Sequence, residues 1–270
     1  MKQPIRQIST SPADRPSSAK SNARPSSSRR SLAGIRILHD DRDIIVVEKP
    51  CGMLTVATDH EETRTAYYLL TDYVRKGCIR SRNRVFIVHR LDRETSGLLV
   101  FAKHEAAQRT LQDHWETTTK QYLAGVHGTP IQPTGTINSY LAENSAYVVY
   151  ATSDHVLGKL ARTDYRVIQS VRRFSLLEVA ILTGRKHQIR VHLANLGYPV
   201  VGDEKYGNSQ DGYSRLALHA WSLSFDHPHT GKRMSFTSGI PSFVRSLMGS
   251  DHPALAAGPT LNCMITKGPA

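Results

Sequence analysis

Residues 85–101 read VFIVHRLDRETSGLLVF and carry a strong structural signal. Two runs of β-branched, aliphatic and aromatic residues, at 85–88 and 98–101, predict two short buried strands. The segment between them, residues 89–97, is polar and charged, which predicts a loop. Buried strands on both sides hold such a loop rigidly, and rigid supports position a reactive side chain better than a free loop does. Asp92, in this loop, is therefore the first candidate for chemistry.

Further strands and helices are expected on both sides of this loop. On the N-terminal side, the pattern predicts strands at residues 35–38 and 44–49 and a helix at 65–76. On the C-terminal side, it predicts a helix at 105–117, strands at 120–126 and 173–182, and a helix at 185–195 that stops at Gly197. These elements show no regular strand–helix–strand alternation and no repeat. The sequence therefore predicts an α+β fold with a mixed or antiparallel sheet.

The composition is that of a soluble globular chain. Of the 270 residues, 39% are hydrophobic and 21% charged, which suits one sizeable domain or two small ones. No run approaches the roughly 18 apolar residues of a membrane helix, and the first 30 residues contain no apolar core of a signal peptide. Cys51, Cys78 and Cys263 lie far apart without a CxxC pair, which indicates a reducing compartment. We expect a cytoplasmic monomer with no membrane partner.

Positive charge is concentrated at the N-terminus. The chain has 35 Lys and Arg against 23 Asp and Glu, and the net charge of +12 favours a polyanionic partner. Residues 1–34 hold seven of these cations and one acid, Asp14, among many Ser and Pro residues. We expect them to form a disordered basic tail, with an organellar transit peptide as the alternative. The folded domain is then expected at residues 35–250, followed by a frayed tail at 251–270.

The loop alone leaves two interpretations of Asp92 open. Arg90 and Arg93 flank it in sequence, and neighbouring cations favour an ionised carboxylate that is available as a nucleophile or base. A loop aspartate also commonly caps a turn or pairs with an arginine. Spacing by itself favours this second, structural interpretation.

A second polar segment, TGRKHQIRVH at residues 183–192, opens the last expected helix. Arg185, His187 and Arg190 lie near its N-terminus, where unpaired backbone N–H groups also attract anions. The segment predicts phosphate binding and a solvated basic helix face equally well. His187 and His192 are five residues apart instead of four, and no carboxylate partner accompanies them, so no metal site is expected. Because GxxxxGK[ST] and GxGxxG motifs are missing from the sequence, no nucleotide cofactor is expected either. The GxSxG elbow of serine hydrolases is also missing.

Six segments together resemble the RluA family of pseudouridine synthases. They are IIVVEKPCG (44–52), HRLDRETSGLLVFAK (89–103), KQYLAGVHG (120–128), GKLARTDYRV (158–167), TGRKHQIRVHLANLGYPVVGDEKYG (183–207) and RLALHAWSLSFDHP (215–228). The HRLDxxTSG and TGRxHQIRVH signatures are each specific, and the resemblance extends from residue 35 to residue 228. It favours the catalytic interpretation of Asp92 over the structural one.

The resemblance implies isomerisation of uridine to pseudouridine in structured RNA, with no cofactor and no metal. Asp92 matches the catalytic aspartate of the family. Tyr122 matches the active-site tyrosine, which stacks on the flipped base and serves as a base toward C5. Arg190 matches the basic residue that is paired with the aspartate. One carboxylate is sufficient because the released uracil stays bound, whereas a glycosidase normally needs two carboxyl groups.

Three further residues are expected to bind the RNA. Arg90 matches the arginine that fills the place of the extruded base, a task suited to a planar cation. Arg185 and His187 are expected to contact the RNA or to support the site. The implied fold is a single domain with a bent, mostly antiparallel sheet, flanking helices and a basic cleft around Asp92.

The identity of the RNA is less constrained. Ribosomal and transfer RNA are both substrates in this family, and we favour ribosomal RNA. Residues 1–34 are too few for the S4 domain of some relatives, so recognition is expected to rest on the catalytic domain, alone or together with the basic tail. Two alternatives share the RNA partner. One is a catalytically idle RNA-binding or ribosome-assembly protein with the same fold, and the other, disfavoured by the lack of a carboxylate cluster, is a metal-dependent nuclease.

Overall fold

The computed structural model describes residues 31–249 except 59–60, 79 and 208–211, so both expected tails lie almost wholly outside it. The strands are β1 (Ser31–Leu32), β2 (Ile35–Asp40), β3 (Ile44–Lys49), β4 (Phe86–Ile87), β5 (Ser96–Ala102), β6 (Thr119–His127), β7 (Thr134–Glu143), β8 (Val149–Thr152), β9 (Lys159–Ser170), β10 (Phe174–Ile181), β11 (Leu218–Asp226) and β12 (Arg233–Thr237). The helices are α1 (Ala66–Arg75), α2 (Glu105–Asp113), the 3₁₀ turn η1 (Trp115–Thr117), α3 (Gln188–Asn195) and α4 (Ser242–Met248). None of the described helices is long and apolar enough to cross a membrane.

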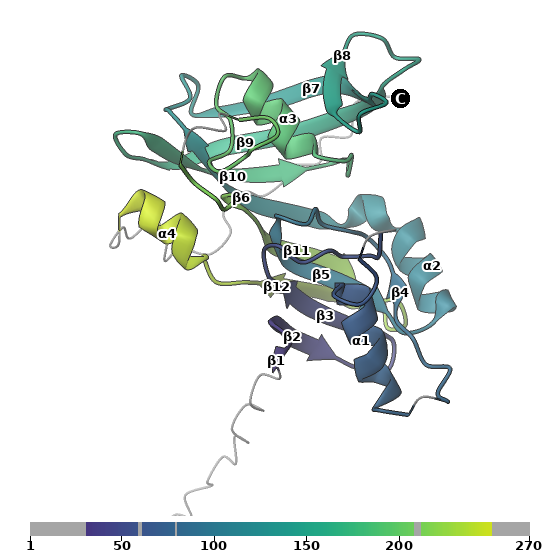
Figure 1. Cartoon of the computed structure of the whole chain (residues 1–270). Coiled ribbons are helices and arrows are strands. Elements are labelled where there is room, and N and C mark those ends of the chain that lie inside the picture. Colours follow the sequence, from purple (N-terminus) through teal and green to yellow (C-terminus); the bar gives the residue numbers. More distant parts are fainter. Residues whose placement is uncertain (1–30, 59–60, 79, 208–211, 250–270) are drawn as a thin grey trace, which may run out of the picture.

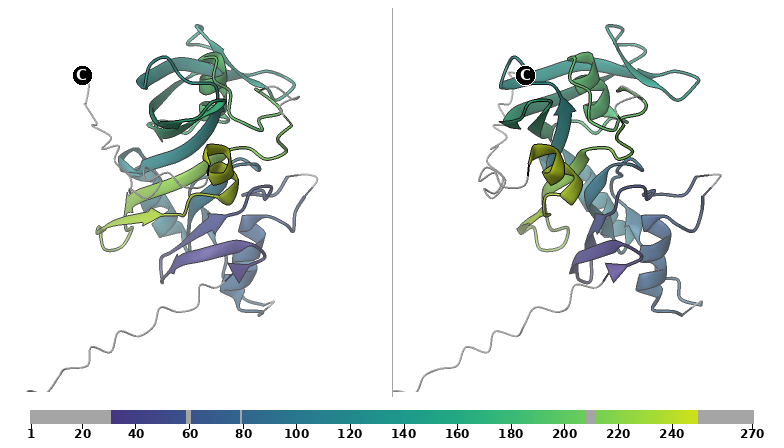
Figure 2. Two further views of the ribbon diagram at one scale, coloured as in Figure 1. Left: turned by 90° about the vertical axis from the view of Figure 1, so that its left-hand side faces the viewer. Right: turned by 60° about the vertical axis from the view of Figure 1, so that its left-hand side comes forward.

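All of these strands belong to one sheet. Its order is β1-β2-β3-β5-β11-β6-β10-β9-β7-β8, with β12 paired to β11 and β4 to β5. Among the described strands, β5 and β11 pair in parallel, and the other pairs are antiparallel. The sheet bends so that β7 to β10 and α3 form one half and β1 to β5 the other, with β6 passing between the halves (Figures 1 and 2). The predicted α+β fold with a mostly antiparallel sheet is confirmed.

The apolar runs at 44–47 and 98–101 reflect burial on both sides of the sheet. In β5 every residue is buried, and β3 is buried apart from Glu48. Alternate residues of β3 face opposite sides: Ile45 packs in one cluster with Leu70 of α1, and Val46 packs in another with Leu111 of α2. Continuous apolar runs are typical of strands covered on both faces. The helices on either side thus fix the strands that carry the loop of Asp92.

The helix predicted at 65–76 is confirmed as α1. The Thr65 hydroxyl accepts the N–H of Tyr68 as its N-cap, and Lys76 ends it in the left-handed conformation. The helix predicted at 105–117 is α2 followed by the short turn η1. His104 caps α2, because its Nδ1 accepts the N–H of Ala107 at 3.2 Å.

Residues 31–34, which the sequence analysis assigned to the disordered tail, lie in the described part of the chain. Leu32 pairs with Ile35 across a two-residue turn, and the φ angles of Ala33 and Gly34 are 47° and 90°. Two consecutive positive φ angles are typical of a type I′ hairpin, which matches the right-handed twist of the strands. The last residues of the stretch 1–34 therefore extend the sheet by one short strand.

The parallel contact of β5 with β11 depends on Gly97. Its φ is 118°, and a Cβ atom there would lie 2.2 Å from the carbonyl oxygen of Ala220. Beside it, Ser96 Oγ is hydrogen-bonded to Nδ1 of the buried His219 at 2.8 Å. The strand that follows the Asp92 loop is therefore fastened to β11 at its first two residues.

Candidate active site

The loop of Asp92 is tied down on both sides of that residue. Thr55 donates its hydroxyl to the carbonyl of Leu91 at 2.8 Å and accepts the N–H of Leu91 at 3.1 Å. On the other side, the carbonyl of Arg93 accepts the N–H of Gly52 at 2.9 Å. Buried Leu91 and these backbone bonds fix the main chain, while the Asp92 side chain keeps 24% exposure. The carboxylate is therefore rigidly presented to solvent.

Lys49 supports the same loop from beneath. Its side chain is fully buried, and Nζ donates to the carbonyls of Pro50, Met53 and Arg93 at 3.0, 2.7 and 3.1 Å. Burial lowers the pKa of Lys49 to about 8, and the charges of Cys51, Glu94 and Asp92 act in the opposite direction. The sequence analysis missed Lys49 as a support, although it stands in the quoted IIVVEKPCG segment.

Arg190 of α3 joins Asp92 to a second aspartate. Its Nε and Nη2 atoms donate to Asp203 at 2.8 and 2.7 Å, and Nη1 lies 3.7 Å from Oδ2 of Asp92. Asp203 Oδ1 also accepts the N–H groups of Lys205 and Tyr206, both at 3.0 Å. Burial acts to lower the pKa of Arg190, but the hydrogen bonds and charge of Asp203 raise it above its ordinary value. The guanidinium therefore stays charged and presents one edge to Asp92.

His187 precedes α3 and faces Asp92 from the same side. Its φ of 53° is left-handed, so the helix starts at Gln188 and not at Arg185 as predicted from the sequence. Its Nε2 lies 3.9 Å from Oδ2 of Asp92, and Nδ1 is 2.7 Å from the hydroxyl of Tyr206. That hydroxyl accepts the N–H of Val149, so its own proton points to Nδ1. Burial lowers the pKa of His187, which favours a neutral ring with its proton on Nε2, toward Asp92.

Tyr122 comes from β6, where the two halves of the sheet meet. Its side chain is buried, with 8% exposure. Burial and the negative charge of Asp92 both raise the pKa of Tyr122 well above its ordinary value. The phenol therefore keeps its proton while Asp92 is ionised.

One pocket brings together all six residues singled out in the sequence. Its lining includes Arg90, Asp92, Tyr122, Arg185, His187 and Arg190, and apolar side chains such as Leu91, Ile189 and Leu218 contribute walls. Arg90 and Arg185 are exposed at the rim, and Arg185 donates Nε to the carbonyl of Leu160 at 3.0 Å. Apolar walls with a few convergent polar groups are typical of a small-ligand site. The pocket therefore suits a small, partly apolar ligand, with Asp92 in its lining.

The sequence analysis missed two residues of this site besides Lys49. Asp203 binds Arg190, and the Tyr206 hydroxyl orients His187. The ring of Tyr206 also contacts the guanidinium of Arg190, whose Cζ atom lies 5.2 Å from the ring centroid. Both stand in the segment GDEKYG, which was quoted for the resemblance and given no role. The carboxylate and the aromatic ring next to each other were the available signal.

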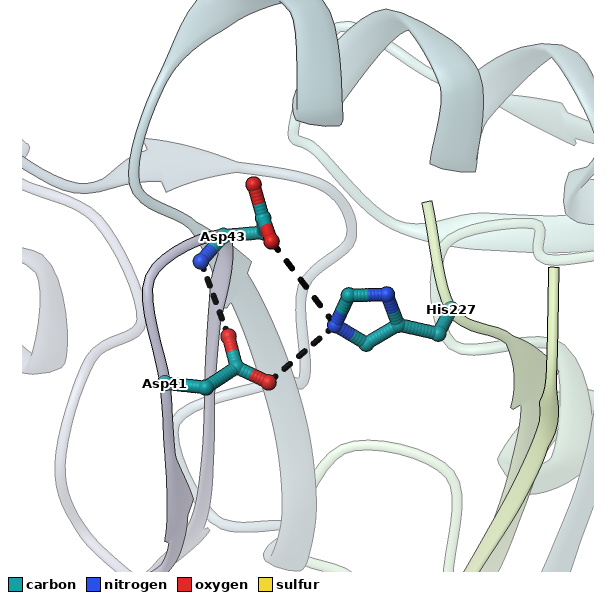
Figure 3. A group of neighbouring side chains, drawn as sticks. All are labelled: Asp41, Asp43 and His227. Carbon is teal, nitrogen blue, oxygen red and sulfur yellow. Dashed lines mark hydrogen bonds and ion pairs between the residues drawn. The ribbon is translucent and has the colours of Figure 1, made fainter. Parts of the chain in front are cut away.

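A second group of ionisable residues lies away from this pocket, where Asp41 and Asp43 of the β2–β3 turn face His227 (Figure 3). His227 Nε2 is 3.1 Å from Asp41 and 4.0 Å from Asp43. Its Nδ1 accepts the N–H groups of His229 and Thr230, both at 3.2 Å. The neutral ring must then carry its proton on Nε2, the nitrogen that faces the two aspartates. A metal bound there would need a free lone pair on Nε2 instead of a proton. The group fits a hydrogen-bonded link between two turns and does not fit a metal site.

Comparison with known proteins identifies the family. A family model described as RNA pseudouridylate synthase matches residues 43–195. An uncharacterized RNA pseudouridine synthase of Bacillus subtilis, YlyB, is 36% identical over 218 residues, which are 78% of this chain and 71% of that protein. Ribosomal large subunit pseudouridine synthase D of Nitrosomonas europaea is 34% identical over 227 residues, covering 79% of this chain and 64% of that protein.

Solved structures agree with this family at the level of the fold. Human RNA Pseudouridylate Synthase Domain Containing 1 aligns with a TM-score of 0.63 and 28% identity, covering 81% of this chain and 88% of that one. Human RNA Pseudouridylate Synthase Domain Containing 4 aligns with a TM-score of 0.65 and 24% identity, covering 77% and 89%, and supports the fold alone. The chain belongs to the RluA family of RNA pseudouridine synthases, and it is an isomerase that acts on RNA.

Proposed function

We propose that Asp92 is the catalytic group and that it acts on the sugar of a uridine bound in the pocket. The carboxylate attacks C1′ or takes a proton from the ribose while the N1–C1′ bond breaks. The freed uracil turns in place, and C5 bonds to C1′ as the bond to Asp92 breaks or as the ribose recovers its proton. The hydrogen that C5 carried then leaves as a proton, and N1 takes up a proton. Because the base stays in the pocket, no water has to be activated and no second carboxylic acid is required.

The observation that carries this proposal is the convergence of Arg190 and His187 on one exposed oxygen of Asp92. Arg190 lies 3.7 Å and His187 3.9 Å from Oδ2 of Asp92, and both belong to the α3 segment. A fixed cation and an N–H donor favour the ionised, oriented carboxylate that a nucleophile or base requires. In this scheme Asp203 and Tyr206 are positioning residues, because they act through Arg190 and His187.

The other pocket residues each have a separate role in binding the flipped uridine and the RNA around it. Tyr122 stacks on the uracil and relays the C5 proton. Its phenol oxygen accepts that proton while its own hydroxyl proton passes to the Asp92 carboxylate, which the new C5–C1′ bond has released. Arg90 fills the space of the extruded uridine, since a planar cation can stack within an RNA helix. Arg185 holds RNA phosphate at the rim of the pocket.

We propose large-subunit ribosomal RNA as the substrate. Two relatives support it by their names: ribosomal large subunit pseudouridine synthase D of Nitrosomonas europaea and that of Zymomonas mobilis, each 34% identical to this chain. Mapping of pseudouridine across all cellular RNA with and without this protein tests the assignment. If the protein's absence removes a pseudouridine only from transfer RNA, then transfer RNA, and not ribosomal RNA, is the substrate.

Tritium release from 5-labelled uridine in RNA tests the reaction itself. Release that is unaffected by a chelator, without strand cleavage, is the expected result. Binding without release would indicate an idle RNA-binding or ribosome-assembly protein with this fold, and chelator-sensitive cleavage would indicate a nuclease.

A further inference from the structure

A second basic hollow lies outside the pocket of Asp92. We call it the α1–β4 groove; its lining includes Arg42, Tyr73, Lys76, Arg84 and Lys103 and one carboxylate, Asp40. It combines the end of α1 and the loop that follows with the β2–β3 turn and the end of β5; α1 and β4 are seen in Figure 1. None of these residues belongs to the pocket around Asp92.

The groove keeps a surplus of positive charge after its internal pairs are counted. Lys103 pairs with Asp40, and the Tyr73 hydroxyl donates to the same carboxylate at 3.0 Å. Among the described residues, no carboxylate forms an ion pair with exposed Arg42 or Lys76. The contact of Arg84 with Glu105 is long, 3.9 Å, and both side chains are more than half exposed, so solvent screens it. Three cations therefore remain available to an anion in the groove.

Further cations continue from the groove along the chain. Residues 75–84 read RKGCIRSRNR, with five cations and no acid. The first two stand at the C-terminal end of α1, where the helix dipole favours cations by itself. Arg80, Arg82 and Arg84 follow the helix and gain nothing from its dipole, and all three are exposed. A small anion needs one or two cations, whereas a row of them suits the repeating phosphates of a nucleic acid.

The loop is also anchored and close to the catalytic segment in sequence. Arg75 Nε donates to the carbonyl of Asn83 at 3.2 Å, and the N–H of Ser81 donates to the carbonyl of Cys78 at 3.0 Å. Arg84 precedes Asp92 by eight residues, and eight extended residues span at most about 29 Å. A single RNA stem can therefore reach from the pocket to the groove.

We propose that the α1–β4 groove binds the sugar–phosphate backbone of the substrate RNA and forms a second anchoring surface beyond the nucleotide pocket. The identity of that RNA rests on the proposed function, but the binding does not require turnover. Exposed arginines and lysines supply phosphate contacts without reading the sequence, so the groove strengthens binding and fixes the direction of the stem.

Binding as a function of salt tests this surface. The triple variant Arg42→Gln/Lys76→Gln/Arg84→Gln is compared with a matched control, Lys159→Gln/Arg172→Gln/Arg173→Gln, whose residues are exposed on β9 and the β9–β10 turn. The probes are an RNA hairpin with an extended stem and one with a short stem, both carrying the target uridine. Asp92→Asn is included in every protein, so that turnover plays no part in the measurement.

With the extended stem, loss of three phosphate contacts should reduce the log–log salt slope by about 2 to 2.7. The ratio of affinities between 50 mM and 200 mM salt then falls by about 20- to 40-fold. We expect no such change for the control triple, and a smaller one for the groove triple on the short stem. All variants should unfold at the same temperature as the parent.

Equal slopes for the groove triple and the control triple would overturn the proposal. It would also be overturned if the groove triple kept its RNA slope but lost binding to an acidic peptide, because the groove would then dock a protein. A wild-type protein that binds RNA with the predicted slope but releases no tritium would refute the proposed reaction and leave the groove assignment standing.

Discussion

Arg190 binds Asp203 through two nitrogen atoms and directs its third, Nη1, to Oδ2 of Asp92 at 3.7 Å. The distance to Asp92 is longer than a hydrogen bond, whereas both contacts to Asp203 are short. Asp203 thus fixes the guanidinium, and the guanidinium provides a preset charge beside a carboxylate that remains exposed. Under the proposed function, Asp203 holds the arginine in place and Asp92 carries out the chemistry.

Replacement of Asp92 by Asn should abolish isomerisation. The amide has nearly the same shape but cannot act as a carboxylate nucleophile or base, so turnover should fall by about a thousandfold or more. Tritium release measures turnover, and the melting temperature and RNA affinity should stay near those of the wild type. A purified Asp92→Asn protein that turns over at the normal rate would refute the assignment.

Replacement of Asp203 by Asn should affect both stability and turnover. It leaves Arg190 buried without its main partner, and breaking a buried ion pair from one side costs about 3–5 kcal/mol. Because Arg190 also loses its fixed orientation, kcat should fall at temperatures where the variant is still folded, with little change in KM.

Glu178→Gln is the matched control for Asp203→Asn. Glu178 is also buried and pairs with an arginine, Arg166, at 2.6 Å, but neither residue lines the pocket. It should lower the unfolding temperature and leave kcat intact. An equal loss of kcat in both variants would make the role of Asp203 merely structural.

Tyr122→Phe should separate stacking from proton transfer. The ring remains, so RNA should bind normally, but the loss of a positioned acid–base group should slow turnover by about a hundredfold. Because burial and the charge of Asp92 raise the pKa of Tyr122, the phenol starts protonated, and it can accept the C5 proton only by passing its own proton to Asp92. If single-turnover rates are unchanged, Tyr122 only stacks.

Arg90→Ala should slow modification of a structured RNA much more than that of an unpaired one. Unstacking a base costs a few kcal/mol only where there is a stack to leave. Arg93→Ala is the control, because it removes a neighbouring charge from the same loop. Arg93 pairs with Glu61 at 3.2 Å, and its loss should affect both RNAs alike. Equal losses on both RNAs for Arg90→Ala would contradict a role in base extrusion.

The stability of the fold should decrease with acid through His219. Burial, with the charges of Arg215 and Arg36, lowers the pKa of this histidine to about 4. Below the usual histidine pKa of about 6.5, the unfolded chain then binds a proton that the folded chain does not. This contribution is complete above about pH 6.5 and is lost toward pH 4, at up to about 1.4 kcal/mol per pH unit.

Denaturant unfolding at several pH values between 4 and 7 measures this slope. His219→Gln should flatten it by up to about 1.4 kcal/mol per pH unit, and the exposed His155→Gln should leave it unchanged. A slope that His219→Gln does not alter would assign the acid sensitivity to other groups.

The sequence predicted those elements whose apolar pattern is continuous or helical. Residues 44–47 and 98–101 are apolar because helices cover both faces, and α1 is marked by Thr65 as well as by its spacing. In contrast, the periodicity analysis missed β7 and β9. In β7 most residues are at least partly exposed, and the buried positions of β9 include Ala161 and Thr163, which give little hydrophobic signal.

The six residues singled out from the sequence line one pocket, but the internal geometry of that pocket was not predicted. The motifs singled out Asp92, Tyr122 and Arg190 without indicating that Asp203 holds the arginine more tightly than Asp92 does. The distances from Arg190 to Asp92 and Asp203 depend on how α3 and the loop after it pack against the sheet. This packing joins segments far apart in the chain, so no local sequence pattern predicts it. The start of α3 was misplaced for a related reason, since the left-handed conformation of His187 is unusual outside glycine.

The hydrogen bond between Ser96 and His219 joins residues 123 positions apart. During synthesis, the Asp92 loop leaves the ribosome long before β11, the strand against which β5 closes. Contacts that are so distant in sequence form late, because the intervening chain must first be made and its loop closed. A nascent or truncated chain that ends before β11 therefore has every pocket residue except Leu218 but no assembled site, and activity should appear only when the last strands are in place.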